Sequence, residues 1–288
     1  MGVVDRPIIE AMEMIAQGNF NIDLSVFIKQ VHSPENPLYE VAQSINHMAN
    51  ELGQLEKMRQ EFISNVSHEI QSPLTSISGF AHALKQNDLS VEERHHYLSI
   101  IEAESKRLSK LSENLLKLTS LEAEHPTVDP KNYRLDRQLR RIVLSCEPQW
   151  NEKQIEMEVE LDPVSIDADE ELMDQVWINL LHNAIKFTPS GGKIMMDLRV
   201  MDNKEVGVRI QDTGIGMTKD VQMRIFERFF KGDKSRNRLM DGNGLGLSIV
   251  KKIIDLHQGK ITVESTEGEG TTFTILLPLT DLRPTAEY

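Results

Sequence analysis

The chain has 288 residues and a formal net charge of −13, from 32 Lys and Arg against 45 Asp and Glu. This acidic balance argues against a nucleic-acid partner, because no basic stripe is present to offset phosphate charge. The single cysteine excludes an intrachain disulfide framework and a cysteine-rich metal site. No apolar run approaches the roughly 18 to 20 residues that span a bilayer. Composition therefore predicts a soluble chain of several parts.

The first fifty residues contain two short amphipathic helical patterns separated by a connector. Apolar residues recur at helical spacing from Ile8 to Ile15, and Gly18 follows. An irregular, proline-containing stretch at residues 33–37 comes before the second pattern, at residues 41–52. This spacing predicts two short helices with a connector between them.

A long helical hairpin is predicted next. From Met48 the positions of a repeat step by three and four residues, with Arg59 filling one site that is otherwise apolar, as in packed bundle helices. The first helix is expected to end near residues 86–88, and Ser90 with Glu93 forms a capping-box pattern that opens a second helix. The apolar positions of the two helices are Met48, Leu52, Leu55, Phe62 and Val66, then Ile101, Leu108, Leu111, Leu115 and Leu118.

Each helix of this hairpin is too thin to bury its own apolar face. Pairing with a second copy of the chain gives a dimeric four-helix bundle, which is the favoured expectation. The alternative is that the hairpin docks on another domain of its own chain.

Residues 126–132 have the proline and charge content of a linker, and mixed α and β patterns follow. Strands are predicted at 155–161, 193–201, 205–211, 260–265 and 271–278, and helices at 135–150, 170–187, 219–230 and 245–257. This order predicts one sheet with helices packed on it, an α/β sandwich.

Two segments of this domain carry polar groups suited to a nucleotide. Asn179, Asn183 and Lys186 lie on one face of a predicted helix, where amides and an ammonium suit a hydrated cation and polyphosphate. Asp212, Gly214 and Gly216 follow a predicted strand directly, and a carboxylate at a strand end can accept from an exocyclic amine. Each motif alone is weak, since a solvated face or a turn gives the same pattern.

Two further segments complete the set. Residues 226–231 are an aromatic cluster that ends in basic residues, of which Arg228 and Lys231 are candidates for the phosphate side. Gly242, Gly244 and Gly246 precede an apolar helix, whose N-terminal N–H groups would form an anion site. The polar stretch at residues 233–241 is typical of a mobile lid over phosphates.

The fixed order of these four motifs resembles the ATPase domain of histidine kinases, gyrase B and Hsp90-type proteins. The resemblance implies that Asn183 holds Mg²⁺ with support from Asn179, and that Lys186 faces the phosphates of ATP. It further implies that Asp212 accepts from the adenine amine, Phe187 flanks the base, and Gly244 and Gly246 line the polyphosphate. The remaining cofactor-binding residues of this prediction are Gly214, Gly216, Arg228, Lys231, Gly242 and Leu245.

One of the nine histidines stands in an unusual setting. His68 lies inside the first long helix beside Glu69, and Pro73 follows five residues later. A helix-interior proline removes a hydrogen bond at a cost of about 3 kcal/mol. A neutral imidazole is a competent nucleophile near neutral pH, and an adjacent carboxylate can take or orient the proton on its other nitrogen. The alternative interpretation is that His68 is an ordinary surface histidine next to a glutamate, without a catalytic role.

The segment from Ser67 to Leu74 resembles the phosphoacceptor motif of sensor histidine kinases, usually His-Glu-Leu-Arg-Thr-Pro-Leu. Gln71 replaces the usual basic residue, and Ser72 replaces the threonine that positions the water which dephosphorylates the partner response regulator. A serine hydroxyl keeps the donor and acceptor but loses the methyl group that restrains the rotamer. His68, Glu69 and Ser72 are therefore the predicted catalytic residues.

The N-terminal region is similar to a HAMP signalling module. Arg6-Pro7-Ile8, Gly18-Asn19-Phe20 and the helix at 41–52 carry the likeness, although the usual acidic opening of the second helix is missing. The expected domains are a HAMP-like linker at 1–55, a dimerisation and histidine phosphotransfer hairpin at 56–125, and an ATP-binding domain at 126–288. The likeness implies a transmembrane segment before the printed sequence, a cell-membrane protein with this region cytoplasmic, and Met1-Gly2 as an artificial start.

The expected activity is a protein histidine kinase that phosphorylates His68 from ATP and Mg²⁺. Its expected partners are a second copy of the chain and a response regulator receiver domain. The alternatives are a catalytically silent, nucleotide-gated dimeric scaffold, and an ATPase whose hydrolysis drives clamp closure.

Overall fold

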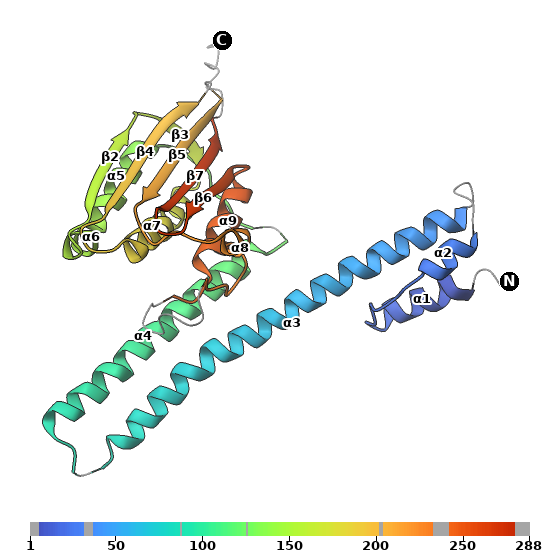
Figure 1. The fold of residues 1–288 in the computed structure, drawn as a ribbon, viewed down its shortest axis with the longest axis horizontal. Helices are drawn as coiled ribbons and strands as arrows, with labels where there is room; N and C mark the ends of the chain where they lie inside the picture. The colour runs from blue at the N-terminus through green and yellow to red at the C-terminus, as the bar shows by residue number, and fades with distance from the viewer. Residues whose placement is uncertain are drawn as a thin grey trace. The chain divides into compact units, whose positions relative to one another are not determined.

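A computed structural model gives the structure of the chain and describes residues 6–31, 37–86, 88–124, 126–201, 204–232 and 242–279. The chain divides into two compact units, Met1–Thr75 and Ser76–Tyr288, each considered by itself below (Figure 1). The predicted lid at 233–241 lies outside the described residues, as does most of the irregular stretch at 33–37. Among the described helices, none combines the length and apolar character needed to cross a membrane.

The N-terminal unit is built on three helices. They are α1 (Arg6–Ala16), α2 (Ser25–Val31) and α3 (Pro37–Ala83). Ile8 and Ala11 of α1, Phe27 of α2, and Ala42 and Ile45 of α3 form one buried cluster. The prediction of two short helices was wrong in two respects: the connector holds a helix of its own, and the second helix is the start of the 47-residue α3.

Helix α3 is continuous through Pro73 and across the predicted domain boundary at residues 55 and 56. It ends at Ala83, a few residues before the predicted end. Of the predicted seam residues on it, Met48 and Leu55 are exposed, whereas Leu52, Phe62 and Val66 are half-buried. In the second helix of the hairpin, the seam residues Leu111 and Leu118 are buried.

Helix α4 (Val91–Leu121) begins at the predicted cap. The Ser90 hydroxyl accepts the backbone N–H of Glu93 at 3.1 Å, and the Glu93 carboxylate accepts the backbone N–H of Ser90 at 2.9 Å. The rings of Phe80 and Tyr97 meet at 5.2 Å between centroids and join the end of α3 to the start of α4. The predicted helical hairpin is confirmed.

A five-stranded sheet forms the centre of the ATPase-like domain. Its strands are β2 (Glu156–Leu161), β4 (Lys193–Met201), β5 (Glu205–Asp212), β6 (Lys260–Thr266) and β7 (Gly270–Pro278), in the order β2-β4-β5-β7-β6. Only the pair of β2 and β4 is parallel. Alternate residues of β5 are buried, as expected for a strand with one covered face.

Helices α7 (Glu170–Phe187) and α9 (Gly246–Leu256) pack on this sheet and on each other, and α5 (Leu135–Ser145) packs on α7. Figure 1 shows them on one side of the strands. Trp177 and Leu180 of α7, Met196 of β4 and Ile253 of α9 are fully buried between the layers. The predicted α/β sandwich is confirmed, and the fold as a whole is a helical hairpin followed by this domain.

Several smaller features differ from the prediction. The helix predicted at 135–150 is interrupted at Cys146, where α6 (Glu147–Glu152) begins. The helix predicted at 219–230 is only α8 (Lys219–Arg224), because the chain turns after Arg224. A two-stranded sheet of β1 (Lys131–Arg134) and β3 (Ser165–Ala168) was not predicted, and β1 begins inside the expected linker.

Candidate functional site

The polar face of α7 lies against the glycine-rich turn before α9. The Asn179 side chain donates to the backbone oxygen of Gln175 at 2.8 Å. A Cβ atom on Gly246 would come within 2.9 Å of Asn179 Oδ1, and one on Gly242 would come within 3.1 Å of Lys186 Nζ. Two of the three predicted residues of α7 therefore touch this turn, and Asn183 lies one helical turn after Asn179, half-buried.

Asp212 occupies a buried position at the end of β5. Its side chain is 6% exposed, and Oδ1 accepts the backbone N–H of Gly214 at 2.8 Å. Burial raises the pKa of this carboxyl from 3.8 to about 6, against the lowering effect of backbone hydrogen bonds from Gly214 and Thr271. A buried carboxyl that can still accept a hydrogen bond is suited to bind the exocyclic amine of a base.

Gly214 and Gly216 allow the turn after Asp212 to approach its neighbours closely. A Cβ atom on Gly214 would lie 2.6 Å from the backbone oxygen of Phe187. Gly216 has a φ of +64°, and a Cβ atom there would lie 1.8 Å from the backbone oxygen of Thr266. The same Phe187 oxygen accepts the N–H of Ile215 at 3.2 Å. The turn is thus fixed to the end of α7, and the two motifs form one site.

The turn before α9 presents the N-terminus of that helix to the α7 face. Gly244 has φ +67°, and a Cβ atom there would lie 2.7 Å from the Phe229 backbone. The Gly244 carbonyl accepts the N–H of Phe229 at 2.9 Å, while Leu245 is fully buried. A side chain on any glycine of this turn would meet Lys186, Phe229 or Asn179, so glycine keeps the start of α9 close to the polar face of α7. The N–H groups of a helix start suit the phosphates of a nucleotide, and an amide oxygen and an ammonium nearby suit Mg²⁺ and phosphate.

The aromatic cluster at 226–231 takes a different form from the predicted helix. Phe229 has φ +61°, so the segment cannot continue α8, and the buried apolar side chain is Ile225 rather than Phe226. The Arg228 guanidinium pairs with the carboxylate of Glu122 at the end of α4. Lys231 is exposed. The described contacts therefore connect Arg228 to α4 and leave its predicted phosphate role untested.

His68 lies on the N-terminal unit, on an exposed turn of α3. Glu69 is half-buried and Ser72 is exposed, while Pro73 is buried. The Ser67 hydroxyl donates to the Ile63 carbonyl at 2.9 Å, and the Thr75 hydroxyl donates to the Gln71 carbonyl at 2.8 Å. These hydroxyl bonds lie on both sides of Pro73, where the helix has lost a backbone donor. The imidazole is accessible on an otherwise ordered helix.

Sequence reasoning missed three residues that the structure brings to the nucleotide region. Thr271 pairs with Asp212 through the register of β5 and β7, which no local pattern reveals. Asn243 is only 8% exposed between two glycines of the turn. Lys110 on α4 lines a pocket with this turn, and no sequence motif marked it.

Comparisons with protein families agree with both parts of the site. Residues 58–124 match the family described as His Kinase A (phospho-acceptor) domain, which includes His68. Residues 168–281 match the family described as histidine kinase-, DNA gyrase B-, and HSP90-like ATPase. The two domains occur here in one chain and in this order. The chain belongs to the sensor histidine kinases of two-component systems.

Individual histidine kinases show the same likeness. The chain is 33% identical over 275 residues to the sensor histidine kinase YclK of Bacillus subtilis (strain 168), covering 94% of this chain and 58% of YclK. A crystal structure of histidine kinase ThkA in complex with response regulator protein TrrA has a TM-score of 0.64 and 27% identity, covering 80% of this chain and 66% of that chain. Full-length ShkA in complex with AMPPNP has a TM-score of 0.57 and 29% identity, covering 76% of this chain and 46% of that chain. The chain spans only 55–58% of the length of the first curated relatives it matches.

Proposed function

We propose that this histidine kinase chain phosphorylates His68 from Mg²⁺–ATP and passes the phosphoryl group to an aspartate of a response regulator. The observation that carries the proposal is the exposed imidazole of His68 beside Glu69, in a chain that also places a glycine-rich turn at the start of α9 against the polar face of α7. An ATPase whose hydrolysis drives clamp closure does not need a histidine that accepts a phosphoryl group.

The nucleotide would be held by groups that the fold brings together. Asp212 accepts from the adenine amine, Phe187 flanks the base, and the N-terminus of α9 receives the polyphosphate. Asn183 provides an amide oxygen to Mg²⁺, which usually keeps several waters and takes few protein ligands besides phosphate oxygens. Mg²⁺ held there would neutralise charge on the phosphates, and Lys186 would add a cation beside them.

In the transfer step, one ring nitrogen of His68 forms a bond to the γ-phosphorus of ATP. The bond from that phosphorus to the β,γ-bridging oxygen breaks, and ADP leaves with the electron pair. The Glu69 carboxylate orients or accepts the proton on the other ring nitrogen. A receiver-domain aspartate then attacks the phosphorus of phosphohistidine, which restores the imidazole.

The rest of the proposal concerns assembly and location. The uncovered apolar residues of α3, with Leu98 and Leu116 on α4, would pack against a second copy in a four-helix bundle. The buried cluster of α1, α2 and α3 would act as a HAMP-like signalling module. A transmembrane segment would connect that module to a sensor region and place this part in the cytoplasm.

Incubation with γ-labelled ATP tests the acceptor. His68→Ala should abolish incorporation of acid-labile label while nucleotide binding persists, and His95→Ala, which removes an exposed histidine of α4, should leave labelling intact. Label retained in the His68→Ala protein would refute the assignment. A chain that binds ATP but never incorporates label would favour the silent scaffold.

A second experiment tests the metal ligand. Asn183→Ala should remove most of the Mg²⁺-dependent affinity for ATP, measured by calorimetry with and without the metal. Undiminished affinity would place the metal on other groups.

A further inference from the structure

A cationic pocket lies between α4 and the glycine-rich turn before α9. Its volume is about 320 Å³. Both sides belong to the compact unit Ser76–Tyr288. The lining residues are Ala103, Lys106, Arg107, Lys110 and Asn114 on α4, and Gly242 and Asn243 on the turn. The α4 residues follow the i, i+3/i+4, i+7 and i+11 spacing of a single helix face.

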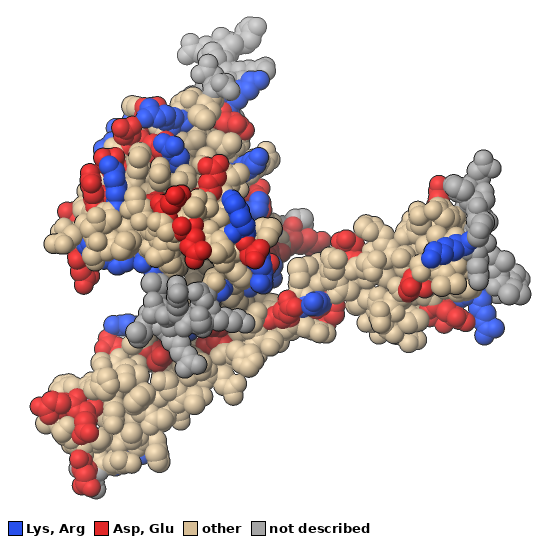
Figure 2. Space-filling model, viewed as in Figure 1, with Lys and Arg blue, Asp and Glu red and all other residues tan. Residues whose placement is uncertain are grey.

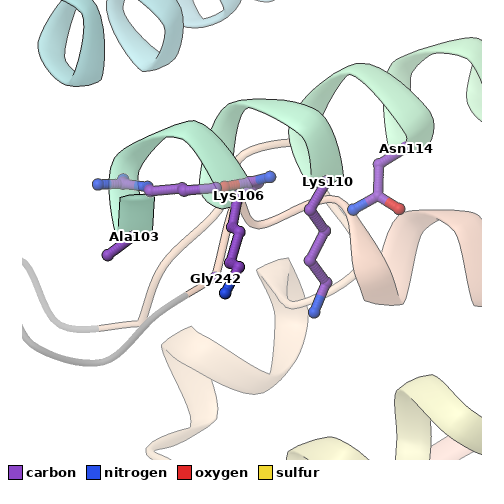
Figure 3. A pocket seen from close by; sticks show the side chains of 7 residues that line it. Ala103, Lys106, Lys110, Asn114 and Gly242 are labelled. Carbon is purple, nitrogen blue, oxygen red and sulfur yellow. The ribbon is translucent and has the colours of Figure 1, made fainter. Parts of the chain in front are cut away.

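The cations of this face differ in their partners. Lys106 pairs with Glu102 at 2.6 Å, and Arg107 lies 3.7 Å from Glu104. Lys110 makes no hydrogen bond or ion pair with any residue in the described ranges. Figure 3 shows the side chains of Lys106 and Lys110 extending from α4 toward the segment that contains Gly242. Lys110 therefore contributes a positive charge that no described carboxylate offsets.

The glycine-rich turn also has a cation of α7 beside it. A Cβ atom on Gly242 would come within 3.1 Å of Lys186 Nζ. Gly242 also lines the pocket together with Lys106, Arg107 and Lys110. Cationic side chains of both α7 and α4 therefore lie near this turn.

We propose that Lys110 binds the polyphosphate of the bound nucleotide, so that α4 of the phosphoacceptor hairpin completes the anion site of the ATPase-like domain. The proposal rests on the proposed function for the identity of the anion. A phosphate group held beside Gly242 and Asn243 would meet the ammonium of Lys110, which pairs with no carboxylate in the described ranges. Lys110 is then a nucleotide-binding residue contributed from outside the four sequence motifs.

Binding measurements on the full 288-residue chain test this role. Calorimetry with Mg²⁺ would compare AMPPNP, which has the whole polyphosphate, with AMP, which presents adenine and a single phosphate. Lys110→Met should weaken AMPPNP about tenfold, the effect of one lost charge-assisted contact, and should change the AMP affinity by less than about twofold. Lys110→Arg should restore most of the AMPPNP affinity.

Lys117→Met provides the matched control, since Lys117 is an exposed lysine of α4 outside the pocket. It should bind both nucleotides as the unaltered chain does. Equal AMPPNP affinity in the Lys110→Met protein would overturn the proposal, and so would a parallel loss for AMP, which indicates a structural defect. Because binding alone is measured, these outcomes are independent of whether His68 becomes phosphorylated.

Discussion

The imidazole Nε2 of His257 accepts the backbone N–H of Asp169 at 3.0 Å, across 88 positions of the sequence. Asp169 is the N-cap of α7, and His257 is the C-cap of α9. The Nδ1 atom of the same ring lies 2.8 Å from the Ile253 carbonyl, which can only accept. The ring is therefore the neutral tautomer with its proton on Nδ1, and it connects the two helices that carry the nucleotide motifs.

This relationship predicts a specific loss of stability. His257→Ala leaves the Asp169 N–H without its acceptor and should lower the free energy of unfolding by about 1 to 2 kcal/mol. Urea denaturation followed by circular dichroism measures the change. His95→Ala on the exposed surface of α4 should have no such effect, and equal stability of the two variants would contradict the assignment.

The buried carboxyl of Asp212 predicts a pH-dependent stability. Its pKa is raised from 3.8 to about 6, so between these values the folded state holds a proton that the unfolded state has released. Stability from this group is thus complete below pH 3.8 and is lost as the pH rises through about 6, by about 3 kcal/mol in total. Asp212→Asn removes this dependence.

Denaturation of both proteins at several pH values tests the effect. The stability of Asp212→Asn relative to the unaltered chain should rise between pH 4 and pH 7, while adenine-nucleotide binding is lost. A stability difference that does not vary with pH would show that the carboxyl ionises as an exposed one does.

Gly216 and Gly191 form a matched pair for the close turn. Both have positive φ, +64° and +78°, but a Cβ on Gly216 would lie 1.8 Å from the Thr266 oxygen, whereas a Cβ on Gly191 meets nothing within 4 Å. Gly191→Ala should cost about 1 kcal/mol from backbone strain alone. Gly216→Ala should cost at least about 2 kcal/mol more, measured by thermal or urea unfolding, because backbone must move. Equal losses of stability in the two variants would show that the backbone around Gly216 moves to accommodate the Cβ atom without further cost.

Ser72 provides a prediction about the reverse reaction. Its side chain is exposed on α3, one helical turn after His68. Ser72→Ala should leave the rate of His68 labelling within about twofold and slow dephosphorylation of the regulator that accepts the phosphoryl group, because the hydroxyl that orients water is gone. The Ser72→Thr variant is the natural control and should retain or increase that activity. Equal dephosphorylation rates in all three proteins would assign the water to another group.

The elements that were predicted well are those with a strong local period. Helix 170–187 and strand 193–201 match α7 and β4 residue for residue, because a buried apolar face repeats along each. The helix at 219–230 was overextended, because Phe226, Phe229 and Phe230 imitate an apolar stripe. Phe229 instead takes a left-handed conformation fixed by its bond to Gly244, a contact fifteen residues away in sequence. Short strands such as β1 and β3 depend on each other and have no local signature.

The candidate site likewise contains residues that stand in local sequence motifs and residues that long-range contacts bring close to them. Asp212, Gly214 and Gly246 stand in short motifs whose chemistry is local, so they could be proposed from the sequence alone. Thr271 enters through strand register, and Lys110 enters through the packing of α4 against α9. Neither relationship leaves a periodic trace in the sequence. Long-range pairing therefore decided which additional groups surround the motifs.

The continuity of α3 has a mechanical consequence within the N-terminal unit. Ala42, Ile45 and Ala49 are buried, and His68 lies on the same uninterrupted helix. The 23 residues from Ile45 to His68 span about 35 Å without a joint, and each residue turns the helix by about 100°. A rotation of α3 at the first cluster is therefore passed to His68 along one continuous helix. Pro73, the proline inside this helix, comes only after the histidine.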